Sequence, residues 1–194
     1  MGIEPNSCDK TEIKIFDKVN YFALNESKAS KRVGIYVDYP NLIGGAINHR
    51  AYADFEFLKR TSDNLGRVVI AKCYAINNCS EKDKYAFLKL ERLGFKLELR
   101  ETPTNDSSRR KDIDPILITD YMQDIYNSNL DIMIIVSDDS DFVHPMRVAK
   151  EKGIKCIAIV SEYKKARVLA ETADAYLEEQ YIPRMPTIYI GGTE

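Results

Sequence analysis

The stretch LDIMIIVSDDSDF, residues 130–142, decides the fold that this sequence predicts. Its apolar run from Ile132 to Val136 is too short to span a membrane and is typical of a strand buried on both faces of a parallel sheet. Asp138, Asp139 and Asp141 follow directly. Crowded carboxylates repel one another unless a cation or a proton lies among them. The stretch therefore predicts either a divalent-metal site at the end of a central strand or a solvated acidic turn in which Asp141 caps the next helix.

Similar apolar runs recur along the chain, and helical patterns separate them. Pro40 marks the end of the first run, and Gly66 the end of the first helical pattern. This alternation predicts an α/β domain with a mostly parallel central sheet, flanked by helices and joined by right-handed crossovers. Strands are expected over residues 33–37, 67–76, 95–100, 130–137, 154–160 and 175–179, and helices over residues 55–65, 80–94, 112–126, 141–153 and 164–174.

Composition points to one globular domain of ordinary size. The chain has 194 residues, of which 44% are hydrophobic and 30% charged. Its net charge of -2 and pI of about 5.8 argue against a passive, charge-driven nucleic-acid binder, so any such contact must come from a local patch. The 4 cysteines show no CxxC spacing and the 2 histidines lie far apart, which argues against a zinc site.

We expect three regions along the chain. They are an N-terminal extension over residues 1–31, a core domain over residues 32–178 and a tail over residues 179–194. The extension mixes apolar and charged residues and is a candidate for homodimer contacts. Neither an apolar leader nor a long apolar stretch occurs, so we expect a cytoplasmic protein without membrane association.

Acidic residues at the ends of two expected strands form a candidate site. Asp38 ends the first strand, Asp139 and Asp141 follow the fourth, and Asp114 opens the helix before it. If the first and fourth strands are neighbours, these acids converge on one crevice at the carboxyl edge of the sheet. Oxygen donors with almost no histidine suit Mg²⁺ or Mn²⁺ rather than zinc. Such sites position and activate water against a phosphodiester.

Two further features lie beside these acids. Asn41, three residues after Asp38, is placed either to hydrogen-bond that carboxylate or a metal-bound water, or to form a local Asx turn. Arg109, Arg110 and Lys111 end a polar loop just before a helix. Such a cluster is usually solvated surface, but beside an acidic site it is suited to hold the backbone phosphates of a substrate.

The chain resembles the NYN domain in three segments, which are, in order, VGIYVDYPNL, KDIDPIL and IIVSDDSDFVHPMRVAKEKGIKCIAIV. NYN domains belong to the PIN-like nuclease superfamily, and the chain is most similar to the LabA-like (DUF88) branch, over residues 32–178. The resemblance implies a three-layer αβα, PIN-like (Rossmannoid) fold. It also implies a Mg²⁺- or Mn²⁺-dependent endoribonuclease that uses water attack without a covalent enzyme intermediate. RNA is then the expected partner, and DNA remains open.

The resemblance also implies roles for individual residues. The matching residues are Asp38 and Asn41 in the first segment, Lys111 and Asp114 in the second, Asp120 one helical stretch later, and Ser137, Asp139, Asp141 and Phe142 in the third. The residues implied as catalytic are Asp38, Asn41, Asp114, Asp139 and Asp141, and all of these except Asn41 are implied as metal ligands. Of the expected substrate contacts, only Lys111 matches the family pattern; Arg109 and Arg110 are expected to contact substrate from their position beside the acids.

The chain departs from the family pattern where glycines are usual. The replaced positions are Asp112, Asp138 and Ser140. Asp138 adds a carboxylate that either alters the number of metal ions or points away from the site. Asp120 lies about 9 Å along its helix from Asp114, so its expected role is to orient Lys111 or a water rather than to bind metal. Ser137 is likewise expected to be auxiliary.

Other functions compete with the nuclease. The same fold is compatible with a catalytically inactive RNA- or metal-binding regulatory module. The DxD triplet formed by Asp139 and Asp141 also occurs in nucleotide-sugar transferases, although Asp38 and Asn41 have no natural role there. A phosphatase with an aspartyl nucleophile would need a second acid two residues after Asp38, where the chain has Pro40.

Overall fold

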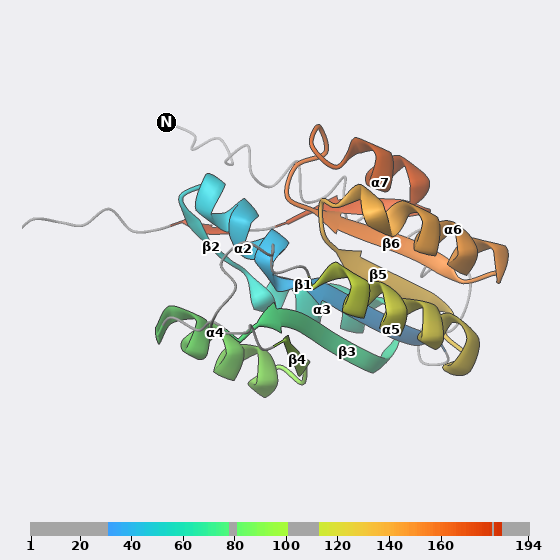
Figure 1. Cartoon of the computed structure of the whole chain (residues 1–194), viewed down its shortest axis with the longest axis horizontal. Helices are drawn as coiled ribbons and strands as arrows, with labels where there is room; N and C mark the ends of the chain where they lie inside the picture. The colour runs from blue at the N-terminus through green and yellow to red at the C-terminus, as the bar shows by residue number, and fades with distance from the viewer. Residues whose placement is uncertain (1–30, 78–80, 101–112, 180, 184–194) are drawn as a thin grey trace, which may run out of the picture.

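The computed structural model describes residues 31–77, 81–100, 113–179 and 181–183 (Figure 1). The strands are β1 (Arg32–Asp38), β2 (Ala51–Ala53), β3 (Arg67–Ile76), β4 (Lys96–Arg100), β5 (Ile132–Val136), β6 (Lys155–Val160), β7 (Ala175–Glu178) and β8 (Tyr181–Pro183). The helices are α2 (Tyr39–Asn48), α3 (Phe55–Leu65), α4 (Glu81–Arg92), α5 (Asp114–Asn127), the 3-10 helix η2 (Ser140–Phe142), α6 (Val143–Glu151) and α7 (Arg167–Thr172). Within these residues, no helix combines the length and apolar character needed to cross a membrane.

The main sheet is parallel throughout, with the strand order β4-β3-β1-β5-β6-β7. This confirms the predicted α/β fold with a mostly parallel sheet. The chain builds outward from β1 to β4 and then returns to the other side of β1, where β5 pairs with it from Val33 and Ile132 to Val37 and Val136. A strand order that reverses in this way leaves a crevice at the carboxyl ends of the two central strands. The predicted neighbours, β1 and β5, are the two strands at which the order reverses.

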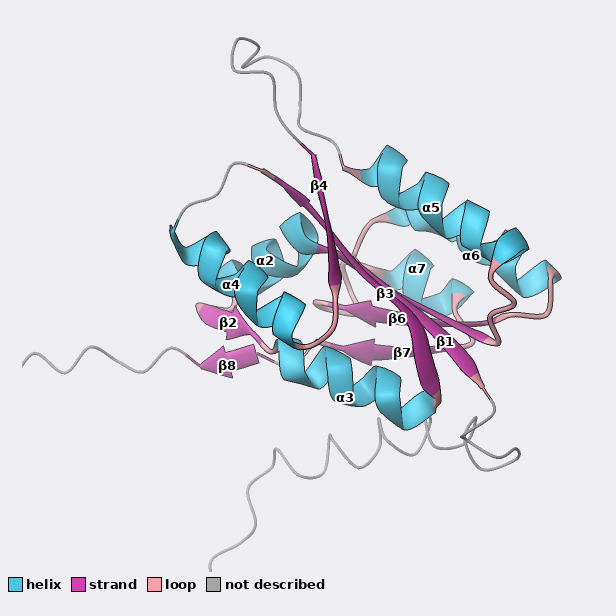
Figure 2. Cartoon of the chain, turned by 90° about the horizontal axis from the view of Figure 1, so that it is seen from below, coloured by secondary structure: helices cyan, strands magenta, loops and turns pink. Residues whose placement is uncertain are grey.

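Helices cover both faces of the sheet and give three layers (Figure 2). Helices α2, α3 and α4 pack on the face to which Val33, Ile35 and Val37 contribute. Helices α5, α6 and α7 pack on the opposite face, where Tyr36 is part of the core. Because successive strand residues point to opposite faces, β1 takes part in both cores. The central strands are therefore buried on both sides, as the apolar run at Ile132 to Val136 predicts.

An irregularity in β3 decides where its polar side chains point. Val33 lies opposite Val68, but the next residue, Gly34, lies opposite Ile70, so β3 contains one extra residue at Val69. Such a bulge re-aims the side chains that follow it. Beyond it, Lys72 faces α5.

The segment after Asp38 is helical, which the sequence analysis does not predict. Pro40 looks like the end of a strand, but in the structure it lies in the first turn of α2. A proline costs no hydrogen bond there, because the first amides of a helix have no partner within the helix. Asp38 caps the helix, so one residue both ends β1 and begins α2.

The packed chain continues beyond residue 178. Glu179 is buried, and β8 pairs antiparallel with β2 in a second, two-stranded sheet. Residues 179–194 are expected to form a tail, because strands of three residues, such as β8 and its partner β2, give no readable alternation. The expected extension over residues 1–31 and the rest of the tail lie almost entirely outside the described residues.

Candidate functional site

Asp38 connects the two central strands at the carboxyl edge. Its side chain is only 3% exposed. One carboxylate oxygen accepts a hydrogen bond of 3.2 Å from the backbone N–H of Asn41, which is the capping interaction of α2. The other oxygen accepts a bond of 2.9 Å from the hydroxyl of Ser137, directly after β5. The carboxylate is therefore held by two separate segments and has a fixed direction.

Ser137 continues the connection toward Asp139. Its buried hydroxyl donates to Asp38 and accepts a bond of 3.1 Å from the backbone N–H of Asp139. The side-chain oxygen of Asn41 accepts from the backbone N–H of Asp138 at 3.1 Å. The start of α2 and the turn after β5 are thus joined by two routes, and both routes begin at Asp38.

The three acids after β5 have different environments. Both oxygens of Asp138 accept hydrogen bonds from Ser161 at the end of β6, one from its backbone N–H at 2.7 Å and one from its hydroxyl. Asp139 is half-buried and accepts from the backbone N–H of Asp141 at 2.9 Å, which caps η2. Asp141 is exposed. The carboxylate of Asp138 therefore faces β6, whereas Asp139 and Asp141 lie on the turn itself.

A further buried acid, Glu179, lies at the same edge of the sheet and was missed by the sequence analysis. Its carboxylate accepts a hydrogen bond from the hydroxyl of Tyr181. Burial is the largest cause of a rise in its pKa to about 8. The Tyr181 bond lowers the pKa, while the charges of Asp138 and Asp38 raise it. The signal that could have found it is its place just after β7, the same position relative to a strand that Ser137 holds after β5.

Close packing accompanies this buried acid. A Cβ at Gly45 in α2 would lie 2.8 Å from the Cβ of Ser161 and closer still to the hydroxyl of Tyr181. Only glycine therefore fits at this point of α2 without a shift of its neighbours. The carboxyl edge from β1 to β7 is a tightly assembled surface.

The remaining predicted site residues are acids of α5, which the structure describes, and basic residues before α5, which lie outside the described residues. Asp114 is the first residue of α5 and half-buried, while Asp120 bonds to Lys72 and Tyr74 on β3. Arg109, Arg110 and Lys111 lie outside the described residues, so their contacts with phosphate stay predictions. The structure thus joins Asp38, Asn41 and the turn after β5, and it directs Asp120 toward β3.

The donor atoms suit a hard divalent cation in kind, because the site offers carboxylate and amide oxygens. Among the described residues, however, no three Asp, Glu, His or Cys side chains are arranged as they stand to hold a metal ion. Two acids of the turn accept hydrogen bonds instead, Asp138 from Ser161 and Asp139 from Asp141. A cation bound here would replace some of these bonds.

Comparison with known proteins places this chain in a family. A model of the NYN domain family matches residues 32–180. The chain belongs to the NYN domain family. NYN domains are members of the PIN-like superfamily of nucleases. The match does not distinguish the LabA-like (DUF88) branch, which stays a prediction.

Two individual relatives extend the comparison. The chain is 26% identical over 161 residues to an uncharacterized protein of Methanocaldococcus jannaschii. The match covers 83% of this chain and 58% of that protein, so the chain spans little more than half of the relative's length. A crystal structure of a protein of unknown function from Vibrio parahaemolyticus is similar with a TM-score of 0.70 and 22% identity, over 79% of this chain and 95% of that one. At this identity the second likeness shows the fold alone.

Proposed function

We propose that this NYN domain is a Mg²⁺- or Mn²⁺-dependent endoribonuclease that hydrolyses RNA phosphodiester bonds. The observation that carries the proposal is the connection from Asp38 through the Ser137 hydroxyl to Asp139, which joins the carboxyl ends of β1 and β5. The carboxyl edge at such a reversal of strand order is where parallel α/β sheets bind ligands. Fixed carboxylates at that place are suited to bind a divalent cation, which in turn can bind a phosphate.

Each residue has a separate task in this proposal. Asp38 and Asp139, with Asp114 and Asp141, would hold the cation, which when bound would activate water and stabilise the leaving oxygen. Ser137 and Asn41 fix the direction of the first carboxylate and of the turn. No side chain acts as a covalent nucleophile.

RNA recognition is proposed for a local basic patch, since the chain as a whole has a net charge of -2. Arg109, Arg110 and Lys111 precede α5 in the sequence and are proposed to contact backbone phosphates. A positive segment beside an acidic centre allows a polyanion to approach carboxylates that would otherwise repel it.

Cleavage of labelled single-stranded, hairpin and duplex RNAs and DNAs tests the proposal, in Mn²⁺, Mg²⁺ or EDTA. Asp38→Asn and Asp139→Asn are expected to lower the cleavage rate by about 100-fold or more, the usual effect of losing one charge-stabilising group. Asp63→Asn, an exposed residue of α3 that pairs with Lys59, is the matched control and should cleave normally. Equal rates in all three variants would show that the activity arises elsewhere.

One observation favours a second candidate, a non-catalytic module that binds RNA or metal. The acids among the described residues are not arranged as a complete ligand set. Tight RNA binding without cleavage in either metal, together with unchanged RNA binding by Asp139→Asn, would favour this hypothesis.

A further inference from the structure

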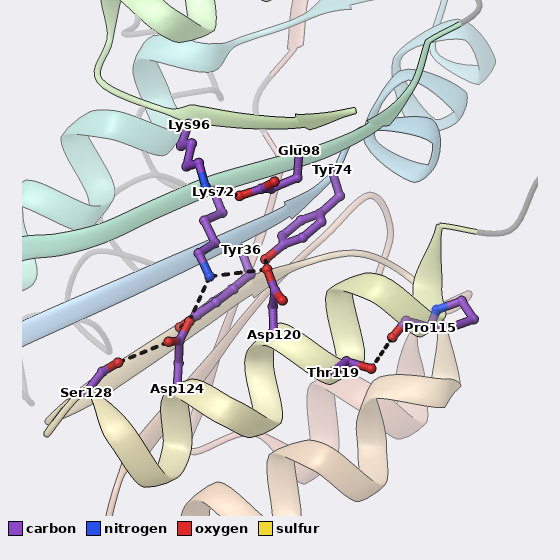
Figure 3. Close-up of polar contacts among 10 residues, drawn as sticks. All are labelled: Tyr36, Lys72, Tyr74, Lys96, Glu98, Pro115, Thr119, Asp120, Asp124 and Ser128. Atoms are coloured by element: carbon purple, nitrogen blue, oxygen red, sulfur yellow. Dashed lines mark hydrogen bonds and ion pairs between the residues drawn. The ribbon is translucent and has the colours of Figure 1, made fainter. Parts of the chain in front are cut away.

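A cluster of ionisable side chains fixes α5 to the sheet, and we call its members the Lys72 cluster (Figure 3). It consists of Lys72 and Tyr74 from β3, Tyr36 from β1, and Asp120 and Asp124 from α5. The ammonium of Lys72 lies 3.2 Å from a carboxylate oxygen of Asp120 and 3.1 Å from one of Asp124. One lysine therefore bridges two acids that lie one helical turn apart.

Two tyrosines of the sheet donate hydrogen bonds to the same two acids. The hydroxyl of Tyr36 donates to Asp124 at 2.9 Å, and that of Tyr74 donates to Asp120 at 2.8 Å. Asp120 and Asp124 are thus each bonded to a tyrosine and to the shared lysine. Burial alone would lower the pKa of Lys72, but its bonds to Asp124 and Asp120 outweigh burial, so its pKa lies above the usual value and the side chain stays charged.

The members of the cluster depend on one another. Like charges four residues apart on a helix repel, so Asp120 and Asp124 are unfavourable neighbours unless a cation lies between them. Lys72 in turn is only 20% exposed, and a charge in that position needs partners. Loss of Lys72 would leave two neighbouring carboxylates facing the sheet, and α5 would then be pushed away from β3.

The cluster lies close to the candidate site. Tyr36 is two residues before Asp38, and Asp38 lies opposite Tyr74 in the register of β1 and β3. The bond from Tyr74 to Asp120 therefore fixes α5 near the carboxyl end of β1. Asp114 lies about 9 Å from Asp120 along the helix axis, toward the N-terminus of α5 and the carboxyl edge of the sheet. The sideways position of α5 on the sheet thus sets the position of Asp114 relative to Asp38.

We propose that Lys72 is a positioning residue for the site: by holding Asp120 and Asp124 it fixes the N-terminal turn of α5 and with it Asp114. The inference rests on the proposed function only for the role of Asp114. It assigns Asp120 to the fixation of α5, which differs from the expectation that Asp120 orients Lys111 or a water.

Hydrogen exchange tests the structural half of the proposal without any activity. Lys72→Met is compared with Lys96→Met, an ideal control because Lys96 is the direct neighbour of Lys72 in β4 and is 71% exposed. Lys72→Met is expected to speed exchange of the amides of residues 116–119, which are hydrogen-bonded in the first turns of α5, by about tenfold or more, because local opening of that end of the helix becomes easier. Lys96→Met should leave those amides unchanged. Unchanged exchange in Lys72→Met would overturn the proposal.

Cleavage kinetics test the functional half. Lys72→Met is expected to lower kcat by about tenfold or more while KM changes less than about twofold, since a displaced Asp114 impairs the reaction and not the capture of RNA. The triple variant Lys72→Met, Asp120→Asn, Asp124→Asn removes the repulsion and should recover most of kcat, which would not happen if Lys72 touched the substrate. A full kcat in Lys72→Met overturns the positioning role.

The two failures can be told apart. If the wild-type protein cleaves nothing, the proposed nuclease fails, and the exchange over residues 116–119 alone decides whether the cluster fixes α5. If Lys72→Met does not fold, Asp120→Asn replaces it, because Lys72 then keeps Asp124 as a partner. That variant should speed exchange in the same turn by a smaller factor, and no change in it would overturn the proposal.

Discussion

Two groups of carboxylates lie on this domain, and they are held by different means. In the Lys72 cluster an ammonium lies within 3.2 Å of two acids, so the protein itself offsets one of the two negative charges of these helix side chains. At the carboxyl edge, each of four acids accepts a hydrogen bond from at least one neutral donor. These donors are the N–H of Asn41 and the hydroxyl of Ser137 for Asp38, Ser161 for Asp138, the N–H of Asp141 for Asp139, and the hydroxyl of Tyr181 for Glu179.

Neutral donors and a lysine do different things to a carboxylate. A hydrogen bond from N–H or O–H orients the oxygen and stabilises its charge locally, but it does not cancel the charge. A lysine ammonium cancels one negative charge, so carboxylates that share it attract a second cation less. The hydrogen bonds at the edge orient Asp38 and Asp139 without neutralising them, as a cation site requires, whereas burial holds Glu179 largely in its neutral form. In the Lys72 cluster, the lysine and the two tyrosines hold both acids without a ligand.

The largest expected effect concerns Glu179 and the dependence of stability on pH. The pKa of a glutamate is about 4.3 in an unfolded chain, and that of Glu179 in the folded chain is about 8. The contribution of Glu179 to the free energy of unfolding is fully present at pH values below the pKa that the glutamate has in the unfolded chain. As pH rises, the unfolded chain releases the proton first, so stability falls, by on the order of 3 kcal/mol between pH 5 and pH 8.

Glu179→Gln cannot ionise and should lose this part of the pH dependence, so its stability relative to the wild type should rise with pH. Urea unfolding in EDTA at several pH values measures the difference. Glu178→Gln is the matched control, because Glu178 is the exposed neighbour. Parallel curves for the wild type and Glu179→Gln would contradict the assignment of Glu179 as a buried acid held in its neutral form.

Mn²⁺ should distinguish the two groups of acids directly. An ion that binds only the folded protein adds about 2.7 kcal/mol to the free energy of unfolding at 100 times its Kd. We expect Mn²⁺ to raise the melting temperature of the wild type and of Asp63→Asn, and to have little effect on Asp38→Asn. Calorimetry of the three proteins with and without Mn²⁺ checks this. An equal rise in Asp38→Asn would place the ion away from the crevice.

Lys72→Met should also reduce stability, by about 2 kcal/mol. Breaking a buried ion pair by removing one partner usually costs more, but the side chains of the cluster are 16% to 25% exposed, and water compensates in part. Lys96→Met should cost less than about 0.5 kcal/mol, since Lys96 pairs with Glu98 at the surface. Urea unfolding of both variants tests the difference. Equal losses would show that Lys72 is an ordinary surface lysine.

The sequence predicts the candidate crevice because the rules involved are local. An apolar run that ends in aspartates shows both a buried strand and its carboxyl end, and parallel connection then brings Asp38 and Asp139 to one edge. The same rules fail for short elements. The pairing of β2 with β8 involves three residues on each side, and Pro40 suits the start of a helix as well as the end of a strand.

The Lys72 cluster could not be predicted for a different reason. Lys72 meets Asp120 and Asp124 across 48 and 52 residues of sequence. Which face of the sheet Lys72 occupies depends on the bulge at Val69, and one extra residue in a strand exchanges the two faces. Nothing in the alternation of β3 shows that bulge before the register with β1 is known.

Ser137→Ala should have a modest effect on stability, and its value lies in its control. The hydroxyl of Ser137 donates to Asp38 and accepts from the N–H of Asp139, so its loss removes two hydrogen bonds and should cost about 1–2 kcal/mol, since each bond contributes about 1 kcal/mol net. Ser62→Ala is the control, because Ser62 is equally buried and bonds to backbone carbonyls of its own helix α3, away from the candidate site; it should cost less, since these bonds lie within the helix and alanine favours helix. Only Ser137→Ala should lower RNA cleavage, by about tenfold, because only there does the hydroxyl fix the direction of a carboxylate. Urea unfolding and cleavage rates of the two variants separate the roles. Equal cleavage by both would mean that the Ser137 hydroxyl stabilises the fold and does not orient the acids of the edge.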